Sequence, residues 1–99
     1  MSPRDWILLA IALSPSRSLQ PLHLQKALCL IGRKLTHEQL RCSRFYNFEP
    51  NEYGPFDAEI YSDVEELEKD GLIITSSEKW PARIYGNTSR GTLHINPLL

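Results

Sequence analysis

The chain has 99 residues, of which 41% are hydrophobic and 23% charged, a size and composition typical of one ordinary globular domain over residues 1–99. A formal net charge of −1 excludes a strongly basic protein that holds nucleic acid through its bulk field. The charges are nevertheless segregated, because residues 57–70 contain seven acids against Lys69 alone, whereas residues 1–56 and 71–99 are each net basic. We therefore expect one acidic face and separate basic ones.

The sequence favours a reducing, cytoplasmic location, since Cys29 and Cys42 form no CxxC pair and two cysteines do not make a secreted disulfide framework. The apolar run after Arg4 resembles a short secretion signal, but Asp5 interrupts the positive region and no Ala-x-Ala cleavage pattern follows. We expect no signal there. No run reaches the ~18 to 20 apolar residues of a membrane span, so no membrane partner is expected.

A first helix is predicted to begin after Ser2 with Pro3, a favourable cap and first-turn pair, and to end at Ser14. Between them, apolar side chains recur at helical spacing: Trp6, Leu9, Ala10 and Leu13. The other face is apolar too, through Ile7, Leu8 and Ile11. A helix this apolar packs either deep in the core, which we favour, or against a second copy of the chain, which leaves a homodimer open.

Pro21 opens a second predicted helix, whose apolar stripe is Leu24, Leu28, Ile31 and Leu35. Off this stripe lie Gln25, Lys26 and Arg33. Leu19 can supply a short strand between the first two helices. Thr36 and Gln39 have the spacing of a capping box, so we expect a short helical turn over Thr36–Arg41.

Residues 47–54 are rich in turn formers and are predicted to be a loop. Gly54 and Pro55 then turn the chain into a third helix, with Gly54 or Asp57 at its amino end and Gly71 as its left-handed carboxyl cap. Its core stripe is Phe56, Ile60, Val64 and Leu67.

Two strands are predicted next, Leu72–Thr75 and Ala82–Tyr85, joined into a hairpin by the loop Ser76–Pro81. Thr88–Gly91 begins one more short element. The expected fold is α+β and mainly α, with three helices followed by a β-hairpin wing, as in a winged helix-turn-helix domain. One departure is that about twenty residues separate the second helix from Pro55, whereas a helix-turn-helix uses a turn of ~3 to 4 residues.

Four segments carry a resemblance to known proteins: His23–Leu28, Phe45–Pro50, Tyr53–Phe56 and Asp70–Ile73. Their succession resembles a set of small prokaryotic winged-helix proteins with a Y-G-P-F motif, and is more distantly similar to the Panacea-domain antitoxins. The resemblance covers roughly residues 18–75 and implies a regulatory or defence-associated module, without chemistry of its own. On the residues alone, we favour an architectural corner at the Y-G-P-F segment over a direct binding role of Tyr53.

No constellation for catalysis is visible. The histidines are scattered at His23, His37 and His94, and no zinc spacing, nucleophile elbow or phosphate loop occurs. We therefore expect no enzyme, no metal, no cofactor and no small-molecule substrate.

The third helix conflicts with ordinary DNA reading. A recognition helix lies among phosphates, which favour basic and amide side chains, yet residues 57–70 are strongly acidic. If DNA is bound, contacts are expected from the second connection and from the wing and the residues beyond it: Arg33, Lys34, Arg41, Arg44, Lys79, Arg83 and Arg90.

Two hypotheses follow. The first is a winged-helix transcription regulator that binds DNA through those basic residues. The second is a protein-interaction module of antitoxin or phage-defence accessory type, which binds a basic partner through the acidic helix and an exposed aromatic ring: Glu59, Glu66, Asp70 and Trp80. Packing of Trp80 against the body of the domain is the alternative to its exposure. The sequence leaves the choice between DNA and protein open.

Overall fold

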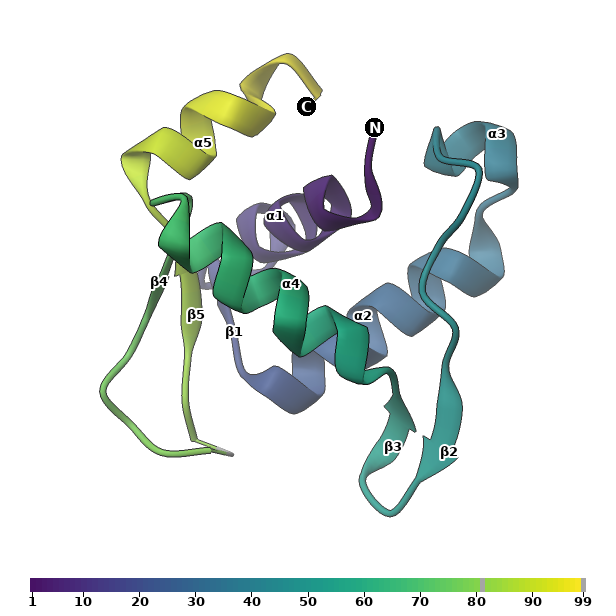
Figure 1. Ribbon diagram of the computed structural model, residues 1–99, viewed down its shortest axis with the longest axis horizontal. Coiled ribbons are helices and arrows are strands. Elements are labelled where there is room, and N and C mark those ends of the chain that lie inside the picture. The colour runs from purple at the N-terminus through teal and green to yellow at the C-terminus, as the bar shows by residue number, and fades with distance from the viewer. Residues whose placement is uncertain (81, 99) are drawn as a thin grey trace.

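The computed structural model describes residues 1–80 and 82–98, and within them the chain is an α+β, mainly helical fold (Figure 1). The helices are α1 (Pro3–Leu13), α2 (Pro21–Lys34), α3 (His37–Leu40), α4 (Ala58–Lys69), α5 (Ser89–Ile95) and a closing 3-10 helix, η1 (Asn96–Leu98). The strands are β1 (Ser18–Leu19), β2 (Glu49–Asn51), β3 (Gly54–Phe56), β4 (Ile73–Thr75) and β5 (Tyr85–Asn87). The predicted class is confirmed, but α1 to α4, four helices instead of three, precede the β4–β5 hairpin in the described residues.

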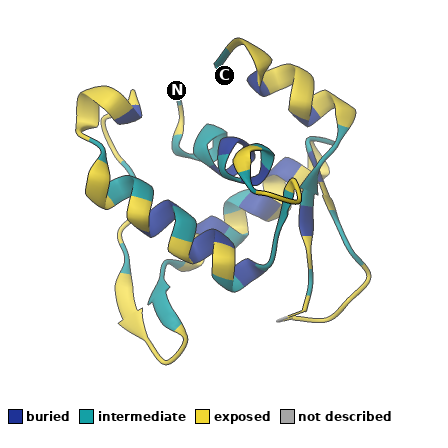
Figure 2. Cartoon of the chain, turned by 180° about the vertical axis from the view of Figure 1, so that it is seen from behind, coloured by how far each residue is buried: buried dark blue, intermediate teal, exposed yellow. Residues whose placement is uncertain are grey.

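The helix α1 runs through the middle of the fold, and its predicted bounds are confirmed (Figure 2). Ile7, Leu8 and Ile11 have no solvent exposure, as expected of a core face, because α2, α4, α5 and β5 all pack against this helix. The predicted stripe was wrong at its end, where Leu13 is 71% exposed. The apolar face of α1, for which packing against a second copy of the chain was the alternative, is thus covered by other elements of the same chain.

In α2, Leu24 and Leu28 are buried as predicted, but Gln25 is also buried, which corrects its place off the stripe. Its side-chain Nε2 donates to the Asp57 carbonyl, and its Oε1 accepts from the Asp57 backbone N–H, both at 3.0 Å. This pair of bonds satisfies the backbone of Asp57 as a neighbouring strand would. As a result, α2 fixes the point where α4 begins.

The short helical turn predicted after α2 is confirmed as α3. Thr36 Oγ1 accepts from the Gln39 N–H at 3.2 Å, and Gln39 Oε1 accepts from the Thr36 N–H at 2.9 Å, which completes the capping box. The turn ends at Arg41, whose φ of 56° is left-handed. The Trp6 indole N–H donates to the Leu40 carbonyl at 2.8 Å and so holds this turn against α1.

The segment predicted as a loop contains a hairpin instead. In the antiparallel ladder of β2 and β3, Glu49 pairs with Phe56 and Asn51 with Gly54, which leaves a two-residue turn. Gly54 adopts a φ of 115°, a conformation that side chains disfavour. Pro50 and Pro55 lie opposite each other, a placement tolerated because this ladder has only two strands and both are edges.

Of the two predicted amino ends of α4, Asp57 is confirmed and Gly54 is wrong, since the helix begins at Ala58 and Pro55 lies in β3 and not in its first turn. Asp57 caps the helix, because its Oδ1 accepts from the Glu59 N–H at 2.9 Å. The predicted core stripe is confirmed from the next turn on, at Ile60, Val64 and Leu67. Gly71 has the predicted left-handed conformation, with a φ of 77°.

The larger sheet has the antiparallel order β1, β5, β4. The short strand expected at Leu19 is confirmed, and it pairs with Tyr85. The second strand of the hairpin was predicted too early, at residues 82–85, because Ser76 bonds to both backbone groups of Ile84 and extends the loop. Pro81, the predicted end of that loop, lies outside the described residues.

The element expected from Thr88 is α5, which the Thr88 side chain caps by accepting from the Gly91 N–H at 3.1 Å. A Cβ at Gly91 would lie 2.1 Å from the Leu72 carbonyl oxygen, so this contact between α5 and the end of α4 requires glycine. None of the described helices has the length and apolar character needed to cross a membrane.

Candidate interaction surfaces

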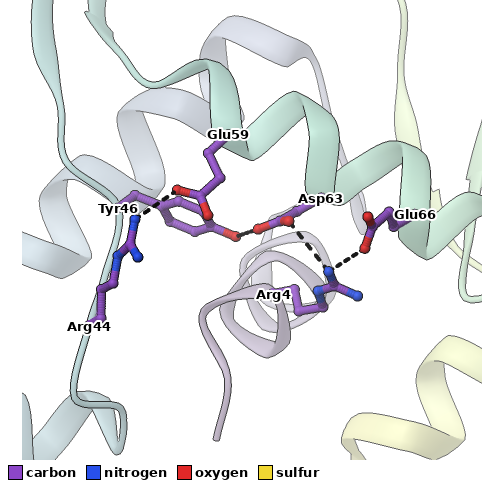
Figure 3. A network of polar contacts seen from close by, with 6 residues as sticks. All are labelled: Arg4, Arg44, Tyr46, Glu59, Asp63 and Glu66. Carbon is purple, nitrogen blue, oxygen red and sulfur yellow. Dashed lines mark hydrogen bonds and ion pairs between the residues drawn. The ribbon is translucent and has the colours of Figure 1, made fainter.

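One stripe of α4 is engaged within the chain (Figure 3). Asp63 accepts a hydrogen bond from the Tyr46 hydroxyl at 2.6 Å and lies 3.6 Å from the Arg4 guanidinium, which also pairs with Glu66. Burial and this bond to Asp63 raise the pKa of Tyr46 well above its usual value, and the bond to Glu66 raises the pKa of Arg4. The stripe thus ties α4 to α1 and to the segment that follows α3.

The same stripe includes Glu59, whose carboxylate lies 3.9 Å from the Arg44 guanidinium (Figure 3). Both side chains are largely exposed, so this pair contributes little to stability. The pair matters more for the predicted sites, because it joins Arg44, a predicted DNA contact, to Glu59, a predicted partner contact. Glu66 also has an ion-pair partner within the molecule. Residues of both predicted sites are therefore engaged inside the chain.

A second stripe of α4, which we call the unpaired face, consists of Tyr61, Glu65 and Glu68, whereas Asp70, just beyond the helix, falls in line with Glu59, Asp63 and Glu66. Within residues 1–80 and 82–98, none of Glu65, Glu68 and Asp70 has an ion-pair partner. α4 packs against β4, and in the adjacent strand β5 burial raises the pKa of Tyr85, as do the charges of Tyr61 and Glu68. The unpaired face therefore presents negative charge to solvent beside the sheet.

The basic residues predicted to contact DNA fall into separate groups. Arg33 and Lys34 end α2, and Arg41 and Arg44 follow α3, all at the upper right of Figure 1. The loop that carries Lys79 and Arg83 lies at the lower left of that view, with α4 crossing between the two groups. On the side seen in Figure 1, the acidic helix therefore lies between the two groups.

Arg90 forms a third group at the start of α5, where its guanidinium lies over Gly71. It is exposed, as are the other predicted DNA contacts with one exception. Arg83 is partly buried, and its Nε donates to the Glu78 carbonyl at 3.4 Å. The structure brings Lys79 and Arg83 into one loop and leaves Arg90 apart from both groups.

Trp80 extends from the β4–β5 loop toward the other hairpin. Its ring meets that of Tyr53 edge-on, with centroids 5.7 Å apart and planes inclined by 72°. The two side chains remain 45% and 53% exposed, respectively. Trp80 is therefore partly exposed and partly packed. It packs against the exposed ring of Tyr53 and not against the core.

Behind this pair lies a cavity of about 220 Å³. We call it the aromatic pocket, after the side chains that line it: Leu22, Tyr53, Pro55, Phe56, Tyr61 and Trp80. Phe56 and Tyr61 form an edge-to-face pair in its wall, with centroids 5.7 Å apart. Sequence reasoning selected Trp80 but missed Leu22, Phe56 and Tyr61 as surface residues. Tyr61 was a usable signal, because it is an aromatic off the core stripe of an acidic helix.

The residues that could support chemistry are dispersed. His94 Nε2 lies 3.0 Å from Asp5 Oδ1 near the surface, Cys29 is buried and Cys42 is half-buried, and both cysteines are free. In the described part of the chain, no three His, Cys, Asp or Glu side chains are placed to hold a metal ion.

The chain was also compared with known proteins. No family model matches it, and neither does any curated protein or solved structure.

Proposed function

We propose that this chain is a non-catalytic module of winged-helix type that binds another protein through the unpaired face and the aromatic pocket. The topology supports the winged-helix part, because β1 lies between α1 and α2, and α4 leads into a hairpin whose second strand pairs with β1. The insertion of α3 and the β2–β3 hairpin between α2 and α4 distinguishes it from a simple helix-turn-helix.

The observation that carries the proposal is the contrast between α4 and its surroundings. In the proposed winged helix, α4 takes the place of the recognition helix, yet within the described residues it presents Glu65, Glu68 and Asp70 unpaired to solvent, and it lies between two groups of basic residues in Figure 1. Phosphates would be repelled there. Beside the same helix, Tyr53 and Trp80 offer the exposed rings that protein interfaces favour.

Of the residues predicted to bind a partner, Asp70 and Trp80 are retained, and the two other acids are replaced. Glu59 and Glu66 are engaged with Arg44 and Arg4, so Glu65 and Glu68 take their place. A basic protein surface fits this arrangement.

DNA binding through the wing stays the second candidate. The observation that favours it is that Lys79 is exposed in the long β4–β5 loop, which projects at the lower left of Figure 1. Wings of this kind reach a DNA backbone without help from the recognition helix.

Titrating labelled duplex DNA with the protein at about 50 and about 200 mM salt distinguishes the two, because phosphate-driven binding weakens steeply over that range. We expect no saturable binding at either concentration. Binding that falls steeply with salt and is lost in a Lys79→Glu, Arg83→Glu variant would establish the DNA function and reject ours.

A photo-cross-linking amino acid placed at the position of Tyr53 tests the protein function directly. In cells that make the chain, we expect cross-links to a discrete protein, and none from a matched replacement of Leu93, which is 68% exposed on α5. Equal cross-linking from both positions, or from neither, would count against the proposal.

A further inference from the structure

The most enclosed apolar feature beside the unpaired face is the aromatic pocket. It is assembled from segments far apart in the chain: α2 through Leu22, the β2–β3 hairpin, α4 through Tyr61, and the β4–β5 loop through Trp80. Its volume of about 220 Å³ lies below the ~300 to 1,000 Å³ of typical small-molecule sites. A space of this size suits a single side chain better than a free ligand.

Charge is distributed unevenly around this pocket. On the α4 side, Glu65 lies one helical turn from Tyr61 and Glu68 two turns, and neither is paired in the described residues. On the opposite side, Lys26 of α2 approaches Gly54 of the lining. The pocket is therefore acidic toward the carboxyl end of α4 and basic toward α2.

One polar group of the lining is also unsatisfied. The Tyr61 hydroxyl is buried and has no hydrogen-bond partner in the part of the chain that the structure describes. Buried hydroxyls nearly always have a partner, so a polar group that reached this hydroxyl would gain a hydrogen bond.

On the basis of the proposed function, we propose that the aromatic pocket receives one apolar side chain from an extended peptide segment of the partner protein. A Lys or Arg within about three positions of that anchor pairs with Glu65 or Glu68. Tyr53 and Trp80 cover the anchor from two sides, because they come from separate hairpins and are each about half exposed. The position of Lys26 sets the direction, with the basic residue of the peptide toward α4.

The test uses random peptides of about 12 residues displayed on phage and selected against the full chain, followed by anisotropy titration of the enriched peptides. We expect the enriched sequences to share an apolar residue close to a Lys or Arg. Their affinity should fall at least about tenfold in Trp80→Ala and in Tyr53→Ala, and several-fold in Glu65→Gln combined with Glu68→Gln.

Matched controls exist for both effects. Leu93→Ala removes an exposed apolar side chain from α5, and Glu38→Gln removes an exposed carboxylate from α3, and neither should change the affinity. Because Tyr53 and Trp80 are about half exposed, their alanine variants are expected to fold, which thermal unfolding of each variant checks.

Each other outcome is decisive. No enrichment, or enriched peptides without the paired apolar and basic residues, would overturn the pocket inference. Peptides that bind equally to the Trp80→Ala and Tyr53→Ala variants but are lost in Asp70→Asn would also overturn it while leaving the protein-binding function intact. Salt-sensitive DNA binding together with no enriched peptide would overturn both.

Discussion

The two stripes of α4 have similar sequences but different surroundings. Glu59, Asp63 and Glu66 face α1 and the segment after α3, where Arg4, Arg44 and Tyr46 engage them (Figure 3). The unpaired face lies on the other side of the helix, where Tyr61 meets residues of both hairpins and Glu65 and Glu68 are exposed to solvent. One helix thus holds the fold together with one stripe and offers charge to a partner with the other.

The formal charge of a helix therefore differs from the charge that it presents to solvent. Of the seven acids in residues 57–70, Asp57 caps the helix and three others are paired, so fewer than half remain free in the described residues. Spacing along the sequence identified the acidic segment. The pairing depends on Arg4 and Arg44, which are distant in the chain.

The largest expected effect concerns the residue that positions both stripes. Gln25→Ala removes two hydrogen bonds and leaves the Asp57 N–H without its acceptor, while the Asp57 carbonyl keeps only the bond from the Ile60 N–H, so it should lower the free energy of unfolding by about 3 kcal/mol. Urea unfolding measures this, with Lys26→Ala as the exposed neighbouring control. Equal losses in the two variants would show that Gln25 does not set the start of α4.

The next effect compares the stripes directly. Asp63→Ala leaves the buried Tyr46 hydroxyl without its acceptor and should cost about 2 kcal/mol, whereas Glu68→Ala should change stability by less than about 0.5 kcal/mol. A double-mutant cycle with Tyr46→Phe assigns the difference, because in that background Asp63→Ala should cost less. An unchanged cost would mean that the bond carries no coupling energy.

The smallest effect is a pH dependence of the paired stripe. The pKa of Tyr46 is raised in the folded chain, so its contribution is complete below the unfolded tyrosine pKa of about 10 and is lost as the pH rises further. Comparing unfolding free energies at about pH 8 and about pH 11, we expect Tyr46→Phe to reduce the alkaline loss by about 1 kcal/mol or more. Tyr85, whose pKa is also raised, accounts for part of what remains.

Much of the fold could be predicted from local signals. The caps at Ser2 and Thr36, the left-handed Gly71 and the buried run from Ile60 to Leu67 all depend on residues a few positions apart. Each therefore leaves its mark in a short window of sequence.

The errors arose where distant contacts decide. Gln25 is polar, yet it is buried because the backbone of Asp57, 32 residues later, bonds to its amide. The β2–β3 hairpin has prolines in its ladder, a composition typical of loops, and only the pairing of Pro50 with Pro55 shows that they face each other at edges.

The candidate site was predictable only in part. Exposure of Trp80 and the role of Asp70 as a free acid agree with the expected partner surface, but the aromatic pocket needs four segments that meet only in the folded chain. The separation of the basic residues, in contrast, was already visible in the sequence, because the acidic segment 57–70 lies between those around α3 and those of the wing, as α4 does in Figure 1.

The most direct test of this division of labour removes three charges either from the paired stripe or from the acids without an ion pair in the described residues. Urea unfolding and peptide binding are compared for Glu59→Gln, Asp63→Asn, Glu66→Gln in one variant and Glu65→Gln, Glu68→Gln, Asp70→Asn in the other, so that net charge changes equally. We predict that the first loses about 2 kcal/mol of stability and keeps its affinity for the selected basic peptides, while the second keeps its stability within about 0.5 kcal/mol and loses that affinity. Equal stability losses in the two variants, or peptide affinity lost only in the first, would contradict the account.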